Sequence, residues 1–202
     1  MKKIRILGLV ALVAALVSGK PVKYGIGDTV EPFKLKNFDG KMVGLSDYKS
    51  AKGAVIVFDC NTCPYSKAYN ERIIALSHKY SAVGFPLIAI NANDPQQSPG
   101  DSFDEMAAKA KKKKYDFPYL IDETQQVAKS FGATNTPHVF VLQKTGNDFK
   151  VAYIGTIDNN SRDASAVTKR YVEEAIDALL SGKTVATPTT KAIGCTIKWK
   201  NT

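Results

Sequence analysis

The sequence predicts an α/β sandwich, because short apolar, β-branched runs alternate with amphipathic helical patterns and the chain closes on paired strands and a helix. A length of 202 residues fits one domain with additions. With 44% hydrophobic and 23% charged residues, the chain can build a core, which argues against disorder. Three cysteines are too few for a scaffold stapled by disulfides.

The first nineteen residues have the pattern of a secretory signal peptide. Lys2, Lys3 and Arg5 precede twelve residues without a polar side chain, and small residues end the segment at Gly19. Because a membrane-spanning helix needs about 20 apolar residues, this run is short for an anchor. We expect cleavage after Gly19, no stable membrane insertion afterwards, and export to the periplasm or the exterior. An uncleaved N-terminal anchor is the alternative.

These features divide the chain into a signal peptide at residues 1–19 and one domain at residues 20–202. The end of that domain, residues 181–202, is expected to be an extended tail.

The net charge of +9 contains one dense basic run, Lys109 with Lys111 to Lys114. Such a run serves either as a docking patch for anions or as a solvated helix end, where cations complement the negative end of the dipole. No aromatic residues interleave with these lysines and no nucleic-acid motif appears. We therefore expect the helix end, and no nucleic-acid partner.

Strands are expected where apolar runs are bounded by turn residues such as Asp39-Gly40 and Gly146-Asn147. They fall at residues 33–35, 42–45, 54–58, 86–90, 119–121, 138–142 and 151–154.

Helices are expected between these strands. Tyr65, Tyr69, Ile73, Leu76 and Tyr80 recur at helical spacing, and Pro64 fits only a first turn, so this helix should begin at about Cys63. The other predicted helices span residues 101–113, residues 125–131 (ended by Gly132) and residues 164–180.

The strongest chemical signal is a C-x-x-C motif, Cys60-Asn61-Thr62-Cys63, between a predicted buried strand and a helix start. A thiol at a helix N-terminus faces unpaired N–H groups and the positive end of the dipole, which favour the thiolate. We expect Cys60 to be exposed and to attack a disulfide, and Cys63 to be shielded and to resolve the mixed disulfide. This chemistry needs no metal or organic cofactor.

Other uses of the pair remain open. A structural disulfide is one. A copper or zinc site is another, with only His78 and His138 available as histidine ligands.

The dipeptide Thr136-Pro137, just before a predicted strand, is a second signal. Proline at a strand start removes a backbone hydrogen-bond donor, and a cis bond there would be a deliberate feature.

With these residues, the sequence resembles the thioredoxin-like superfamily. It looks most like the peroxiredoxin-like redoxins with an alkyl hydroperoxide reductase/thiol-specific antioxidant domain. The resemblance covers about residues 25–200. Its landmarks are Gly27-Asp28, Phe33, Leu45 to Tyr48, Cys60 to Tyr65, Thr136-Pro137 and Gly194 to Lys200.

The resemblance implies a thioredoxin-like sandwich, a central mixed sheet flanked by helices, with an N-terminal strand extension and a C-terminal tail. It also implies that Pro137 is cis and lies across from the cysteine pair, and that the backbone of Thr136 pairs with a substrate chain near Cys60.

The sequence departs from the family at two points. Thioredoxins carry Trp-Cys-Gly-Pro-Cys, whereas Asp59 precedes the pair here; its carboxylate would raise the thiol pKa, unless it points across the strand or accepts a proton. The P-x-x-x-T-x-x-C signature of true peroxiredoxins is missing before Cys60.

The sequence thus predicts an exported thiol–disulfide oxidoreductase. Its partners would be a disulfide-bearing protein or small thiol and an upstream electron donor or acceptor. The alternatives are a thiol peroxidase with Cys60 as peroxidatic residue and a copper-binding thioredoxin-like chaperone. Cys195 is either a third redox thiol or a thiol buried where the tail packs, with Trp199 as its apolar anchor.

Overall fold

A computed structural model describes residues 23–201, so the predicted signal peptide lies outside the described residues. A seven-stranded sheet, in the order β2-β1-β5-β4-β3-β7-β8, forms the centre. Its strands are β1 (Lys34–Asn37), β2 (Met42–Gly44), β3 (Gly53–Phe58), β4 (Leu87–Asn91), β5 (Tyr119–Ile121), β7 (His138–Thr145) and β8 (Asp148–Gly155). The pairs β3–β4 and β4–β5 are parallel and the others antiparallel, so the sheet is mixed as expected.

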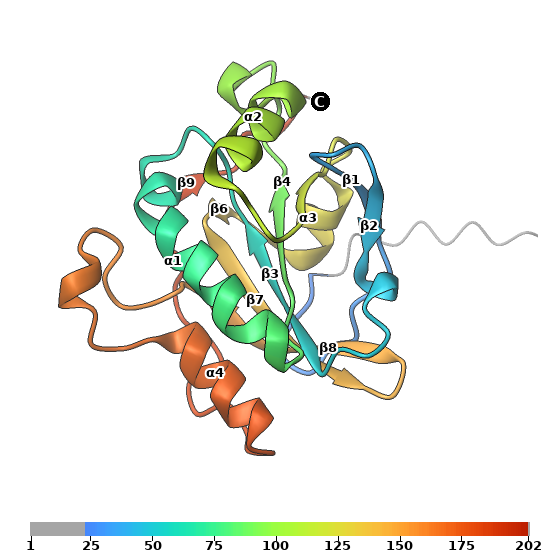
Figure 1. Ribbon diagram of the computed structural model, residues 1–202, viewed down its shortest axis with the longest axis vertical. Coiled ribbons are helices and arrows are strands. Elements are labelled where there is room, and N and C mark those ends of the chain that lie inside the picture. The colour runs from blue at the N-terminus through green and yellow to red at the C-terminus, as the bar shows by residue number, and fades with distance from the viewer. Residues whose placement is uncertain (1–22, 202) are drawn as a thin grey trace, which may run out of the picture.

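Four α-helices surround this sheet (Figure 1): α1 (Pro64–Tyr80), α2 (Phe103–Lys113), α3 (Gln126–Phe131) and α4 (Tyr171–Leu180). The N-terminal hairpin β1–β2 turns at Gly40, which adopts the left-handed conformation that glycine tolerates (φ +85°). Gly132 ends α3 in the same conformation, as the sequence predicts.

Alternate side chains of the central strands enter two cores on opposite faces of the sheet. Along β3, Val55 and Val57 point to the face covered by α1, α2 and α4, whereas Ile56 and Phe58 point to the face covered by α3. Continuous burial of β3, β4 and β5 follows from this double cover.

The helix predicted at residues 164–180 is wrong in its first part. A single 3₁₀ turn, Ala164–Ala166, comes first, and α4 begins only at Tyr171. The side-chain carbonyl of Asn159 accepts the amides of Thr168 and Lys169 at 3.0 and 3.1 Å. These bonds compete with a helix at residues 168–169, because the Asn159 side chain takes two amides that a continuous helix would bond to its own carbonyls.

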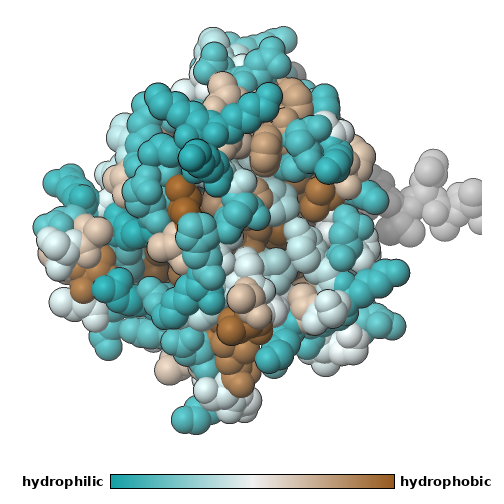
Figure 2. Space-filling view, in the orientation of Figure 1, coloured by the Kyte–Doolittle hydropathy of each residue, from teal (hydrophilic) through white to brown (hydrophobic). Residues whose placement is uncertain are grey.

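The face of the molecule in Figure 2 is mostly hydrophilic, with apolar side chains in small separate patches. None of the helices within residues 23–201 combines the length and the apolar character needed to cross a bilayer.

The C-terminal tail returns across the molecule to the start of α1. Its strand β9 (Cys195–Thr196) pairs antiparallel with β6 (Asn135–Thr136) in a separate two-stranded sheet, with Thr136 opposite Cys195. Figure 1 shows β9 beside β6, near the N-terminal end of α1.

Candidate redox site

The cysteine motif occupies the crossing from β3 to α1, as the sequence predicts. β3 ends at Phe58, Cys63 is the N-cap of α1, and Pro64 takes the first helical position, where its missing N–H costs nothing. This topology places both thiols at the positive end of a helix.

Pro137 lies beside the pair, and the Thr136-Pro137 bond is cis. The Cys60 Sγ is 3.1 Å from Thr136 Oγ1, and the Cys63 Sγ is 3.1 Å from the Thr136 carbonyl oxygen. The structure therefore joins the two signals that lie far apart in the sequence.

The third cysteine joins the same cluster. The Sγ atoms of Cys63 and Cys195 are 2.6 Å apart, and none of the three cysteines is in a disulfide. Cys195 is half-buried. The sequence left two interpretations of Cys195 open, and the structure puts its sulfur at the site itself.

The exposure expected of Cys60 is wrong. Cys60 is 1% exposed and Cys63 is 3% exposed. The Cys60 sulfur lies between Ser66 Oγ at 3.7 Å and Thr136 Oγ1 at 3.1 Å, and the tail brings Cys195 onto Cys63.

The expectation that the Cys60 thiolate is favoured is also wrong for this conformation. Its hydrogen bond with Cys63 raises the pKa of Cys60, and burial and the charges of Asp59 and Asp101 raise it further. The pKa of Cys63 is lowered to about 4, first by the hydrogen bond from Cys60 and also by the one from Cys195. Burial, together with Cys63, raises the pKa of Cys195 to about 11. The hydrogen bonds within the cluster therefore favour the thiolate on Cys63 over the thiolate on Cys60.

Sequence reasoning missed Asp101, which holds the loop between the cysteines. Its fully buried carboxylate accepts the Asn61 amide at 2.5 Å, the Thr62 amide at 3.3 Å and the Thr62 hydroxyl at 2.7 Å. Ser98 and Asn93 donate to it at 2.6 and 2.9 Å. The Asn, Asp, Pro and Gln residues of the segment 91–100 indicate only a loop, and the sequence pattern places Asp101 at the start of the next helix.

Asp59 forms a buried ion pair with Lys109. Asp59 Oδ2 is 3.2 Å from the Lys109 ammonium, and their side chains are 3% and 16% exposed. The ammonium also donates to the Cys60 carbonyl at 3.1 Å. Burial alone would lower the pKa of Lys109, but Asp59 and Tyr115 together outweigh it and the pKa is raised. Lys109 therefore turns inward to the site, whereas Lys111 to Lys114 are exposed at the end of α2, where a solvated helix end is expected.

The two histidines differ in place. His78 is exposed on α1, 3.3 Å from Asp116. His138 follows the cis proline and is buried, and burial lowers its pKa to about 4. Within the described part of the chain, no group of three or more His, Cys, Asp or Glu side chains is arranged to hold a metal ion.

Comparison with known proteins identifies a family and individual proteins to which this chain is similar. The AhpC/TSA family model matches residues 26–151. The thiol-disulfide oxidoreductase ResA of Bacillus thuringiensis is 28% identical over 132 residues, which cover 63% of this chain and 69% of that protein.

Two solved structures extend the comparison. An uncharacterized conserved protein from Geobacillus kaustophilus is 38% identical, with a TM-score of 0.81 over 89% of this chain and 94% of its own. A putative thioredoxin from Neisseria meningitidis is 20% identical, with a TM-score of 0.57 over 78% of this chain and 93% of its own.

These relatives confirm the predicted thioredoxin-like α/β sandwich and the expectation of a thioredoxin-like redoxin of the oxidoreductase class. The roles of Cys60, Cys63, Thr136, Pro137 and Cys195 stay predictions.

Proposed function

We propose a function from one established premise: the chain belongs to the AhpC/TSA family. The protein is a thiol–disulfide oxidoreductase in which Cys60 and Cys63 cycle between dithiol and disulfide. The observation that carries this proposal is the meeting of both thiols with Thr136, next to a cis proline, at the start of a helix. The ResA relatives, named for this activity, support it.

In the proposed cycle, Cys60 attacks the substrate disulfide and Cys63 attacks the resulting mixed disulfide, which releases the reduced substrate. Thr136 and Pro137 form the groove that receives the substrate chain. In the conformation described here the pKa of Cys63 is lowered, and Cys195 is one of the groups that lower it. Cys60 is 1% exposed, so its attack on a substrate disulfide requires that the site opens.

Variants of the pair test the proposal. With dithiothreitol as donor, the wild-type protein should reduce insulin, Cys60→Ser should lose this activity, and Cys63→Ser should accumulate mixed disulfides visible on a non-reducing gel. Trapping by Cys60→Ser instead would assign the first attack to Cys63. Full activity in both variants, without trapping, would remove the proposal.

A peroxide assay addresses the second activity that the family suggests. The signature that precedes a peroxidatic cysteine is missing before Cys60. We expect consumption of hydrogen peroxide with a thiol donor to be slow relative to insulin reduction by the same sample. The reverse ratio would make the protein a thiol peroxidase.

We also propose export, on the signal-like pattern of residues 1–19 alone. Its physiological partners would then be disulfide-bearing proteins or small thiols outside the cytoplasm. Fractionation of cells that produce the full chain, with sequencing of the mature N-terminus, tests both export and cleavage after Gly19.

A further inference from the structure

We propose that the tail segment 194–199 is an internal substrate of this site, whose Cys195 exchanges a disulfide with Cys63. The inference deepens the proposed function and rests on it, because it states that the tail of the same chain occupies the substrate site beside Pro137. Three observations carry it: strand pairing in the groove, a glycine that permits it, and anchors that hold the tail in place.

The tail pairs with the backbone that the resemblance assigns to substrates. Thr136 lies opposite Cys195 and Asn135 opposite Thr196, in antiparallel register. The amide of Ile197 donates to the Thr134 carbonyl at 3.0 Å, and the Asn135 side chain donates to the Gly194 carbonyl at 2.9 Å. An extended chain added to an exposed strand is a recurring mode of peptide recognition.

Gly194 makes this approach possible. A Cβ at position 194 would lie 2.2 Å from the Thr136 carbonyl oxygen and 3.0 Å from the Pro137 nitrogen. Both neighbours are backbone atoms, so they cannot yield as a flexible side chain would. Glycine before the cysteine is therefore a steric requirement of this groove.

The tail is held beyond the cysteine as well. Ile197 is 2% exposed in the core that α3 covers. The Lys198 amide donates to Asn93 at 2.9 Å, and its carbonyl accepts the Asp94 amide at 2.8 Å. Gln125 donates to the same carbonyl at 2.9 Å. These bonds fix the register that places Cys195 against Cys63.

The exchange balances without an external oxidant. In the oxidised protein, the Cys195 thiolate attacks the Cys63 sulfur of the Cys60–Cys63 disulfide. The Cys63–Cys195 bond forms, the Cys60–Cys63 bond breaks, and Cys60 leaves as a thiolate that takes up the proton that Cys195 lost. Burial and the charges of Asp59 and Asp101, which raise the pKa of Cys60, favour that protonation.

The test maps disulfides in the full-length protein. Cys60→Ser is treated with oxidised glutathione, which the two remaining thiols reduce to two molecules of glutathione as they form one disulfide. Trypsin then yields residues 53–67, with Cys63, and residues 192–198, with Cys195. We expect mass spectrometry to find these peptides linked. Two unlinked glutathione adducts, or links between two protein molecules only, would overturn the proposal.

Two further variants test the assignment. Cys63→Ser retains Cys60 and Cys195, and we expect far less linkage there; equal linkage would overturn the pairing of Cys195 with Cys63. Gly194→Val in the Cys60→Ser background should lose the link, and it should also speed alkylation of Cys63, because the tail is displaced. Its control is Ile193→Val, an exposed neighbour that should retain the link.

The readouts separate this inference from the proposed function. A link between residues 53–67 and 192–198 in Cys60→Ser reports the Cys63–Cys195 disulfide that the exchange forms, whether or not insulin is reduced. Insulin reduction without linkage would leave the oxidoreductase and remove the internal substrate. Because the Cys60→Ser experiment leaves Gly194 unchanged, it decides the inference even if Gly194→Val fails to fold.

Discussion

Asp101 supports the site through the backbone of the cysteine loop, so its substitution should affect the fold and the thiols together. In Asp101→Asn, an NH₂ group replaces one of two oxygens that face only donors. We expect the free energy of unfolding to fall by about 1–3 kcal/mol, the cost of an unsatisfied buried group. Denaturant titration of the reduced protein measures this loss.

The control for Asp101→Asn is Asp104→Asn, an exposed carboxylate at the start of α2. It should change the free energy of unfolding only slightly. If both variants lose the same amount, Asp101 has no special part in holding the loop.

The Asp59–Lys109 pair gives a second test at the level of residues. Lys109→Met should leave the Asp59 carboxylate buried without its cation, and we expect a loss of about 3–5 kcal/mol in the free energy of unfolding. Lys111→Met, on the exposed part of the same helix, is the matched control. Adding Asp59→Asn to Lys109→Met should recover part of the loss; no recovery would mean that the cation acts mainly through the Cys60 carbonyl.

Stability of the reduced protein should depend on pH through Cys63. Its folded pKa of about 4 lies below the ordinary value of 9.0, so the thiolate stabilises the fold at high pH. This contribution is lost as the pH falls from about 9 to about 4. The raised folded pKa values of Cys60 and Cys195 lower stability only as the pH approaches 9.0, where the thiols of the unfolded protein ionise, so these two residues contribute little between pH 8 and pH 4.5.

Comparison of the reduced protein with Cys63→Ser isolates the effect. We expect the advantage of the wild type in free energy of unfolding to shrink from pH 8 to pH 4.5, and its thiolate absorbance near 240 nm to decline over the low end of that range. A difference that does not change with pH would place the thiolate elsewhere.

Among the elements, the strands and the first two helices follow from local pattern. β3 and α1 are predictable because burial, helical spacing and Pro64 all indicate the same boundary. Residues 164–170 are different: their composition suits a helix, but Asn159 takes two of their amides. The sequence could not reveal this competition, because it depends on how the loop after β8 folds.

The same distinction applies to the site. The cysteine pair and Thr136-Pro137 are local motifs, and the structure brings them together as expected. The burial of Cys60, the loop contacts of Asp101 and the inward turn of Lys109 arise from residues far away in the chain. No local pattern encodes these contacts.

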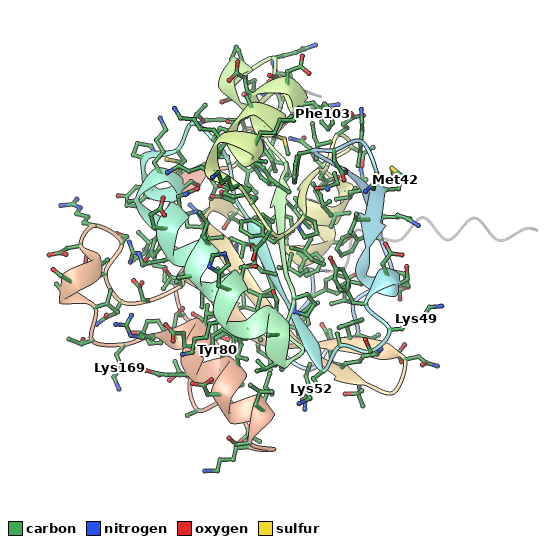
Figure 3. The ribbon with its side chains drawn as sticks, viewed as in Figure 1. Met42, Lys49, Lys52, Tyr80, Phe103 and Lys169 are labelled. Atoms are coloured by element: carbon green, nitrogen blue, oxygen red, sulfur yellow. The ribbon has the colours of Figure 1, made fainter. Side chains whose placement is uncertain are left out.

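A hydrogen bond joins α4 to α1, and the sequence pattern of either helix does not predict this contact. Tyr80, at the end of α1, donates to Asp177 on α4 at 2.9 Å, and Figure 3 shows its side chain beside that helix. Desolvation raises the pKa of the Tyr80 hydroxyl, so it remains a donor at neutral pH. This bond ties α4 to the helix that begins at the cysteine pair.

For the whole molecule, docking of the tail links stability to access to the site. Ile197 is 2% exposed in the core, whereas Ile193, four residues earlier, is 41% exposed. Ile197→Ala should lower the free energy of unfolding by about 2–5 kcal/mol, or less if the tail alone detaches. It should also speed alkylation of Cys63, because the strand that covers the pair loses its apolar anchor. Ile193→Ala should leave both quantities near wild type, and equal effects of the two variants would mean that Ile197 does not hold the tail over the thiols.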